Sequence, residues 1–227
     1  MYELTVFTCV TGGFDNLDKV INAKPKVSPG VRFVAFCDSV KPRTVDGPTA
    51  KWEIRSPIWK HANNNRRTAR FHKVLSHCIF PDTQYSMWID GSQEFKDDVD
   101  PFAVAKEVLA DNDVASFKHP QRNCVYQELE ACAQLAKDDT QVMRDQISRY
   151  QFEGYPPLNG LVETACVCRR HTEPVRRFND MWWHEIEKGS QRDQLSFNYV
   201  AWKLDIDYGY IHGHRSNSPY FVFHPHK

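Results

Sequence analysis

The feature that most constrains this chain is a short aromatic and apolar run that ends in an acid and a glycine. Residues 85–89 have the composition of a short buried strand. Asp90 and Gly91 follow directly, so the carboxylate is expected at the carboxyl end of that strand, where open α/β sheets bind ligands. A carboxylate there suits a divalent cation or a sugar hydroxyl, and the glycine would let a ligand approach the backbone. The pair is equally typical of a plain turn.

Two earlier segments repeat the pattern of a strand followed by polar or glycine residues. Residues 4–10 predict a strand, and Thr11 and Gly12 follow it in a turn that can pass close to a nucleotide. Residues 31–37 predict a second strand. Asp38 at its end suits a ribose hydroxyl, or it simply begins a loop.

Predicted strands and helices alternate along the whole chain. This alternation is typical of a three-layer α/β domain, in which helices cover both faces of a mostly parallel central sheet. The sequence has no internal repeat or obvious linker, so residues 1–227 are expected to form a single Rossmann-like domain. The Walker A, GxGxxG and HExxH motifs are absent, which argues against kinase, dehydrogenase and zinc-protease functions.

A basic stripe marks the helix predicted over residues 66–80. Arg66, Arg70, Lys73 and His77 follow one another at helical spacing, with no acid between them on that face. In a β-α-β unit the helix begins at the edge where strands end, so the two arginines would lie beside the acid of the central strand. Guanidinium groups suit phosphate oxygens, although a solvated basic face is the usual explanation of such a stripe.

Two later segments carry further candidate contacts. His119 follows the strand predicted over residues 114–117. A loop over residues 153–160, rich in proline and aromatic side chains, ends in Asn159 and Gly160. Such a loop is either a contact surface for an acceptor or sugar, or a plain connector.

The last third of the chain adds an acid–amide pair and several histidines. Asp193 and Gln194 open a predicted helix, where an acid also has a structural reason, because it complements the helix dipole. His212 and His214 flank a glycine and can hold a metal or a diphosphate. The closing histidines, of which His226 is the last, belong to a terminus that is expected to fray.

Composition limits the partners and the compartment. The 29 basic and 29 acidic residues give zero net charge, so no global field draws the chain to nucleic acid or to an anionic membrane. No apolar run is long enough to span a membrane, and the first residues do not form a secretory signal. The seven cysteines lack any Cys-x-x-Cys pair and fit buried reduced thiols, so we expect a cytoplasmic protein.

Five motifs together cover nearly the whole chain: NRRTARFHKVL, FPDTQYSMWIDGS, FKHPQRNCVYQE, EGYPPLNGLVE and QRDQLSFNYV. They resemble a family of glycosyltransferase-like domains with a WIDG motif, best known from plant proteins of cell-wall polysaccharide and sphingolipid biology. More distantly, their order resembles the glycogenin and galactosyltransferase group of GT-A folds. The resemblance implies a GT-A-like domain that transfers a sugar from a nucleotide-diphosphate sugar.

The resemblance also implies a role for each matching position. Arg70 and Lys73 would contact the nucleotide, and Asp90 would contact the metal or the ribose. Asn159 and Gly160 would contact the sugar, and Asp193 and Gln194 would contact the reacting sugar. His212 or His214 would contact the diphosphate and the metal.

Ser92 departs from the distant families, which keep a second acid at this position. The chain therefore offers one strong acidic metal ligand here, unless Glu94, two residues further on, substitutes for the missing acid. We expect manganese or another divalent cation to bind weakly until a donor diphosphate completes its ligand shell.

The leading hypothesis is a cytoplasmic glycosyltransferase that uses a nucleotide-sugar donor and an acceptor that the sequence does not identify. Two alternatives stay open: a nucleotidyltransferase, and a carbohydrate- or nucleotide-binding module with little catalytic activity. Sugar transfer to DNA bases, as in some phage-type enzymes, is disfavoured by the zero net charge.

Overall fold

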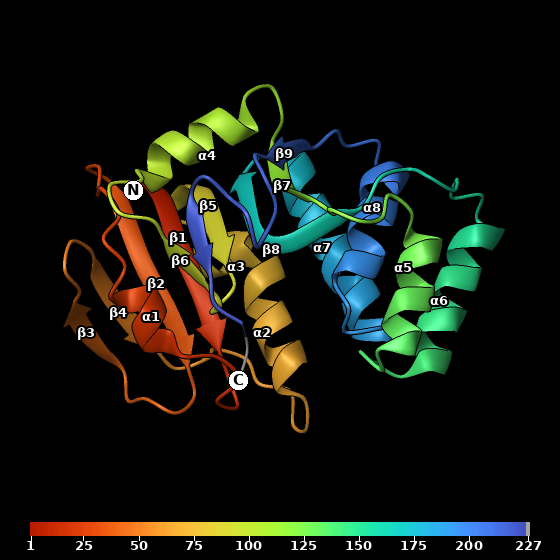
Figure 1. Ribbon diagram of the computed structural model, residues 1–227, viewed down its shortest axis with the longest axis horizontal. Coiled ribbons are helices and arrows are strands. Elements are labelled where there is room, and N and C mark those ends of the chain that lie inside the picture. Colours follow the sequence, from red (N-terminus) through yellow and green to blue (C-terminus); the bar gives the residue numbers. More distant parts are fainter. Residues whose placement is uncertain (226–227) are drawn as a thin grey trace.

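The computed structural model describes residues 1–225 and contains a large sheet of eight strands (Figure 1). The strands lie in the order β3 (Arg43–Asp46), β4 (Lys51–Arg55), β2 (Val31–Cys37), β1 (Tyr2–Val10), β5 (Thr83–Ile89), β8 (Val162–Arg170), β7 (Val114–Lys118) and β9 (Gly209–Ile211). Neighbours are parallel, except that β3 is antiparallel to β4 and β8 is antiparallel to both β5 and β7. The expected α/β class with a mostly parallel central sheet is confirmed.

Helices and a small second sheet cover the two faces of the large sheet. One face packs against α1 (Leu17–Ile21), α4 (Pro101–Leu109) and the antiparallel pair β6 (Gln93–Phe95) and β10 (Phe221–Phe223). The other face packs against α2 (Asn65–Val74), α3 (Ser76–Ile79), α5 (Val125–Gln134), α6 (Thr140–Phe152), α7 (Glu173–Lys188) and α8 (Gln194–Lys203). Figure 1 shows α1 and α4 well apart from α5 to α8. The two buried clusters give the molecule its three layers.

The inner strands are apolar on both sides. In β1, Val6 joins the core beneath α1 and α4, whereas Phe7 joins the core on the opposite face. In β5, Met87 and Trp88 alternate in the same way. Phe7 and Trp88 are partners in the sheet register, and their rings meet edge-on at 5.4 Å. Such strands are mostly apolar, with small buried hydroxyl groups such as those of Thr8 and Ser86, and Asp90 comes directly after the end of β5.

The helix expected over residues 66–80 is broken. Leu75, with φ −88° and ψ 38°, leaves the helical conformation between α2 and α3. His77 therefore lies in α3 and turns toward α7, where its Nε2 is 3.2 Å from Asp180 Oδ1. The expectation that His77 continues the basic stripe is wrong, because the chain changes direction two residues before it.

Several short elements were not expected from the sequence. Pro42, Gly47 and Pro48 give residues 41–51 the composition of a loop, but β3 lies within them and pairs with β4. β4 is therefore not an edge strand. The short strands β6, β9 and β10 and the five-residue helix α1 also lack a clear sequence pattern, because each is held by its neighbours rather than by its own periodicity.

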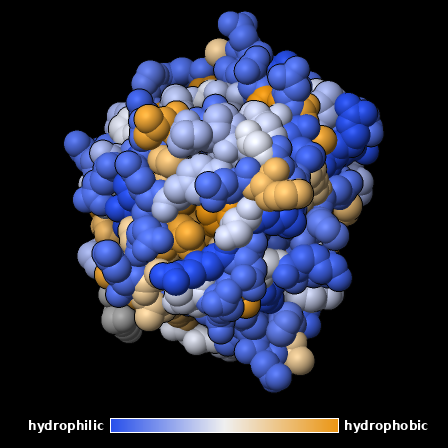
Figure 2. Space-filling model, turned by 90° about the vertical axis from the view of Figure 1, so that its right-hand side faces the viewer, coloured by the Kyte–Doolittle hydropathy of each residue, from blue (hydrophilic) through white to orange (hydrophobic). Residues whose placement is uncertain are grey.

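The surface and the cysteines complete this description. In the described part of the chain no helix combines the length and apolarity needed to cross a bilayer. Figure 2 shows one face of the molecule, which is mostly hydrophilic with apolar side chains in small patches. All seven cysteines are free thiols, and six of them are buried as expected. Cys78 is the exception, since it is exposed.

We predict that Gly91→Ala destabilises the fold. A Cβ atom at Gly91 would lie 2.8 Å from Val10 Cγ2 and 2.8 Å from Asp15 Cβ, so the turn after β5 is closely packed. Overpacking of this kind costs about 1–3 kcal/mol, which urea unfolding would measure.

Ser92→Ala is the matched control for this prediction. Ser92 is buried, and its Oγ has no hydrogen-bond partner among the described residues. Its removal should change the free energy of unfolding by less than about 0.5 kcal/mol. Equal stability of both variants would show that the turn can relax around the added methyl group.

Candidate active site

A cavity of about 1210 Å³ opens at the edge of the sheet where β1 and β5 end and β8 begins. Its wall comes from the turn after β1, the first turns of α2, the segment between β7 and α5, the start of β8, the turn before α8 and the segment after β9. A site for one small ligand usually measures about 300–1,000 Å³, so this cavity has room for two substrates. It lies at the carboxyl end of β5, where Asp90 predicted a site.

Asp90 lies on the cavity wall and is held from three directions. Its backbone N–H donates to the Ala165 carbonyl of β8 at 2.8 Å. Its Oδ1 accepts a hydrogen bond of 2.7 Å from the Trp88 indole and lies 3.7 Å from Lys73 Nζ. The side chain of Asp90 is 26% exposed, so the carboxylate is fixed yet accessible to a ligand.

Asp193 is the centre of a buried ionic cluster beneath the cavity floor. Lys73 Nζ lies 2.6 Å from its Oδ2, and Arg70 Nε lies 3.0 Å from its Oδ1. Thr164 Oγ1 donates a hydrogen bond of 2.8 Å to the same Oδ2. The side chains of Lys73 and Asp193 are each only 1% exposed. Both carboxylate oxygens are therefore occupied by cations of α2 and a hydroxyl of β8.

The charges of this cluster depend on one another. Burial alone would raise the pKa of Asp193, but the charges of Arg70 and Lys73 outweigh it and hold that pKa well below its usual range. Burial lowers the pKa of Lys73, while Asp193 and Asp90 oppose this shift. Asp193 is thus an anion at every physiological pH and a poor proton acceptor.

The elements around the cluster explain its position. Thr11 Oγ1 donates to the Asn65 carbonyl at 2.9 Å and joins the end of β1 to the start of α2. The Asn64 side chain accepts from the backbone N–H of Arg67 and caps the same helix. Asp193 is the N-cap residue of α8 but makes no side-chain capping hydrogen bond, because its carboxylate turns to the cations of α2. The Asp193 carbonyl accepts a bond of 3.0 Å from the Trp182 indole.

Three arginines bring positive charge to one side of the cavity. Arg66 and Arg70 come from α2, and Arg192 comes from the turn before α8. Burial lowers the pKa of Arg66, and the nearby charges of Arg192 and Arg70 lower it further. Guanidinium groups that repel one another beside a cavity form a site for a multiply charged anion. We call these three residues the arginine cluster.

Two further arginines of the cavity wall are already paired with acids. Arg122 Nε lies 2.7 Å from Glu128 Oε2, and His119 Nε2 lies 3.6 Å from the same oxygen. Arg215 Nε lies 3.1 Å from Glu163 Oε1. Of these residues only His119 was predicted. Arg122 follows the same strand end as His119, which is a signal that sequence reasoning could have used. Glu128 comes from α5, whereas Glu163 and Arg215 are brought in by the chain's return through β8 and β9.

The structure brings eight of the predicted residues to the cavity wall: Thr11, Gly12, Arg66, Arg70, Asp90, His119, Gln194 and His214. Six others lie outside the lining: Asp38, Lys73, Asn159, Gly160, Asp193 and His212. Lys73 and Asp193 lie directly behind the wall, in the ionic cluster. The resemblance implied direct contacts with the donor for both residues, but neither side chain lines the cavity.

Asp38 and His212 are outside the lining for different reasons. Asp38 accepts from the backbone N–H of Gly12 at 3.0 and 3.2 Å, so it shapes the turn after β1. His212 is 69% exposed, and its Nε2 lies 3.4 Å from Glu107 of α4. It points to the covering helix and does not join His214 at the cavity.

The loop before β8 ends next to Tyr208, in the segment between α8 and β9, and Asn159 and Gly160 do not line the cavity. Asn159 is exposed, and Gly160 adopts a positive φ of 80°. A Cβ at Gly160 would lie 2.7 Å from the Tyr208 hydroxyl, which accepts a hydrogen bond from Asn198 of α8. The glycine is required here for packing against Tyr208, which does not support the expected contact with the sugar.

The fit of a metal ion to Asp90 is poor. In residues 1–225, no set of three His, Cys, Asp or Glu side chains with atoms close enough to share an ion includes Asp90. Ser92 is buried away from the main cavity, and Glu94 is paired with His224 at 2.5 Å. His214 lines the cavity with Asp90. Of the predicted metal ligands, the cavity lining thus holds one carboxylate, Asp90, and one imidazole, His214. His226 lies outside the described residues.

We predict that Asp193→Asn destabilises the protein in a pH-dependent way. Breaking a buried ion pair costs about 3–5 kcal/mol at pH 7, because Lys73 loses its closest counter-charge. The depressed pKa of Asp193 stabilises the fold above the unfolded-state pKa of about 3.9, and this stabilisation is lost as the pH falls further.

Urea unfolding of wild type and variant from pH 7 to pH 3 measures this effect. The gap between the two free energies of unfolding should narrow below about pH 4. A gap that is small at pH 7, or independent of pH, would contradict a charged Asp193 in the folded protein.

Comparison with known proteins places this site in a family. The sequence model described as TOD1/MUCI70, glycosyltransferase-like domain, matches residues 1–212. Two Arabidopsis thaliana proteins are similar to the chain. A protein named probable hexosyltransferase MUCI70 is 27% identical over 219 residues, covering 88% of this chain and 37% of that protein. A protein named alkaline ceramidase TOD1 is 29% identical over 139 residues, covering 56% of this chain and 30% of that protein.

The chain spans about a third of the length of these two relatives. The family match nevertheless includes Asp90, the arginine cluster and the buried Asp193, and only the lining residues from His214 onward lie beyond it. The chain therefore belongs to the TOD1/MUCI70 family of glycosyltransferase-like domains.

Proposed function

We propose that this domain transfers a hexosyl group from a nucleotide-diphosphate sugar to an acceptor hydroxyl. The observation that carries the proposal is the arginine cluster, Arg66, Arg70 and Arg192, on one wall of a cavity large enough for donor and acceptor. The family and the relative named as a probable hexosyltransferase support the same reaction. Free cysteines support a cytoplasmic location, as the sequence suggested.

The chemistry of the proposed reaction is mainly charge stabilisation. As the glycosidic bond of the donor breaks, the departing diphosphate gains negative charge, and the arginine cluster would stabilise it. Asp193 fixes Arg70 through its Nε, so the rest of that guanidinium is oriented before the substrate arrives. Asp90 and Gln194 supply oxygen and amide groups for ribose or sugar hydroxyls.

Asp193 does not suit the role of general base. Its two oxygens are engaged by Arg70, Lys73 and Thr164, and its low pKa leaves little affinity for an acceptor proton. The proposal therefore assigns Asp193 to positioning Arg70 and Lys73.

Other reactions predict other products. A nucleotidyltransferase would release pyrophosphate, whereas glycosyl transfer releases a nucleoside diphosphate. The relative named alkaline ceramidase suggests amide hydrolysis of a lipid as a second candidate. The wall cations Arg66, Arg70 and Arg192 suit a diphosphate better than an uncharged amide. Analysis of the products formed from nucleotide sugars, nucleoside triphosphates and ceramide separates these three reactions. A binding module with little catalytic activity would show only slow hydrolysis of the donor in the absence of an acceptor.

We predict that Arg66→Ala weakens binding of a nucleoside diphosphate by roughly 10-fold to 100-fold, because one charge-assisted phosphate contact is lost. Calorimetric titration measures the affinity. Arg66 is the best member of the cluster for this test, since Arg70 also belongs to the buried ionic cluster. Arg144→Ala, an exposed substitution on α6 outside the cavity, is the control. If both variants bind the nucleoside diphosphate with equal affinity, Arg66 does not contact the phosphates and is a solvated surface residue.

We also predict that manganese and nucleotide bind together. Asp90 and His214 are too few ligands for the ion, so its affinity should be poor alone and should rise when a nucleoside diphosphate completes the shell. By linkage, manganese must tighten nucleotide binding by the same factor. Calorimetry with and without EDTA tests this, and Asp90→Asn should abolish the coupling. Nucleotide affinity that is insensitive to EDTA would leave the arginine cluster as the sole diphosphate site.

A further inference from the structure

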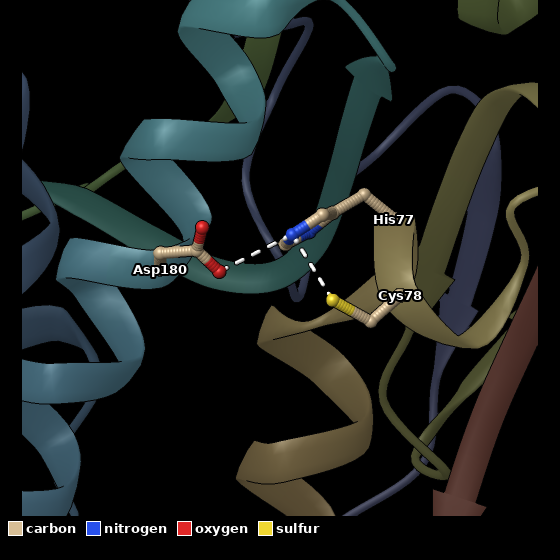
Figure 3. Close-up of side chains that lie close together, drawn as sticks. All are labelled: His77, Cys78 and Asp180. Atoms are coloured by element: carbon tan, nitrogen blue, oxygen red, sulfur yellow. Dashed lines mark hydrogen bonds and ion pairs between the residues drawn. The ribbon is translucent and has the colours of Figure 1, made fainter.

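A second group of chemically reactive side chains lies away from the cavity. His77 and Cys78 belong to α3, which precedes β5, whereas the cavity lies beyond the opposite end of that strand. Asp180 belongs to α7, and its carboxylate points toward the two α3 side chains (Figure 3). The break at Leu75 that takes His77 out of the basic stripe is what creates this group.

The distances within the group match those of a metal site. His77 Nε2 lies 3.2 Å from Asp180 Oδ1 and 3.2 Å from Cys78 Sγ, and all three atoms lie within 4.8 Å of one another. Ligands on a tetrahedral Zn²⁺, with bonds of about 2.0–2.3 Å, are roughly 3.3–3.6 Å apart. Small side-chain rotations would therefore suffice to place one ion between them.

The imidazole of His77 has the partner that metal-bound histidines require. Its Nδ1 lies 3.2 Å from Asn179 Nδ2, and Asn179 is fully buried. Asn179 Oδ1 has no hydrogen-bond partner among the described residues. Exchanging the two ends of this amide lets Oδ1 accept from Nδ1–H and leaves the Nε2 lone pair free for a metal, while the NH2 group takes the position without a partner.

The protonation states are also suitable. Burial lowers the pKa of His77, and the positive charges of Arg169 and Arg176 lower it further. Asp180 raises this pKa but does not reverse the shift, so the imidazole is neutral at pH 7. Burial and Asp180 raise the pKa of Cys78, which stays a thiol until a metal displaces its proton.

We propose that His77 Nε2, Cys78 Sγ and the Asp180 carboxylate bind one Zn²⁺ ion, with solvent as the fourth ligand. Sulfur and imidazole select Zn²⁺ over Mg²⁺ or Ca²⁺, which prefer oxygen. Binding replaces the thiol proton, so one proton is released for each ion bound. The ion would join α3 to α7. Trp182 of α7 donates a hydrogen bond to the Asp193 carbonyl, so the ion would also stabilise the helix that holds Asp193 next to the cavity.

Titration of the metal-stripped chain with Zn²⁺ and with Co²⁺ tests this proposal. We expect one equivalent of Zn²⁺ to bind by calorimetry, with proton release, and Co²⁺ to give a thiolate-to-metal charge-transfer band. Cys78→Ser should abolish that band and weaken Zn²⁺ binding at least about 10-fold, as loss of a ligand does. Asp180→Asn should weaken binding in the same range.

Two controls keep the assignment specific. Glu187→Gln removes an exposed carboxylate from the same helix and should leave Zn²⁺ affinity unchanged. Asp90→Asn removes the cavity carboxylate and should leave the Co²⁺ band unchanged. Circular dichroism verifies that each variant is folded. A wild-type chain without a charge-transfer band, or a band that persists in Cys78→Ser, would overturn the proposal, as would equal loss of affinity in Glu187→Gln.

Discussion

The ionic cluster of Lys73, Asp193 and Arg70 is the constraint on which the rest of the site depends. Burying an ammonium and a carboxylate costs several kcal/mol for each ion, so their positions must be matched closely. The match ties α2 to the start of α8, and Thr164 extends it to β8. Trp182 anchors the Asp193 backbone from α7. Three helices and an inner strand thus meet at a single residue, Asp193.

The cluster also determines how charge is shared between the interior and the cavity. Asp193 neutralises Lys73 and engages one nitrogen of Arg70, while Asp90 contributes a second, more distant carboxylate to Lys73. Positive charge on the remainder of Arg70 then adds to that of Arg66 and Arg192 at the wall. Arg122 and Arg215 differ, because their charges are paired with Glu128 and Glu163. The cavity wall therefore combines arginines that suit an anion with ion pairs that carry little net charge.

Features of the site that depend on a short stretch of sequence could be predicted, whereas those that depend on residues far apart in the chain could not. The strand before Asp90 was predictable, because a buried strand followed by Asp-Gly is a local pattern, and the spacing of Arg66 and Arg70 placed both on one helix face. The burial of Lys73 was not predictable, since it requires knowing that Asp193, 120 positions later, lies beneath it. The antiparallel direction of β8, which brings Glu163 and Thr164 to the cavity edge, likewise depends on sheet topology alone.

The break at Leu75 shows how a small backbone change divides one sequence pattern into two chemical environments. A continuous helix would have kept His77 on the face of Arg66, Arg70 and Lys73, where a further cation would only add repulsion. Because the chain turns, the first three residues serve the cavity and the ionic cluster, and His77 meets Asp180 on α7 instead. The same α2 and α3 therefore contact α7 on either side of the turn, through Arg67 to the end of α7 and through His77 to its middle. The geometry of α7, and with it the Trp182 support of Asp193, is set by both contacts together.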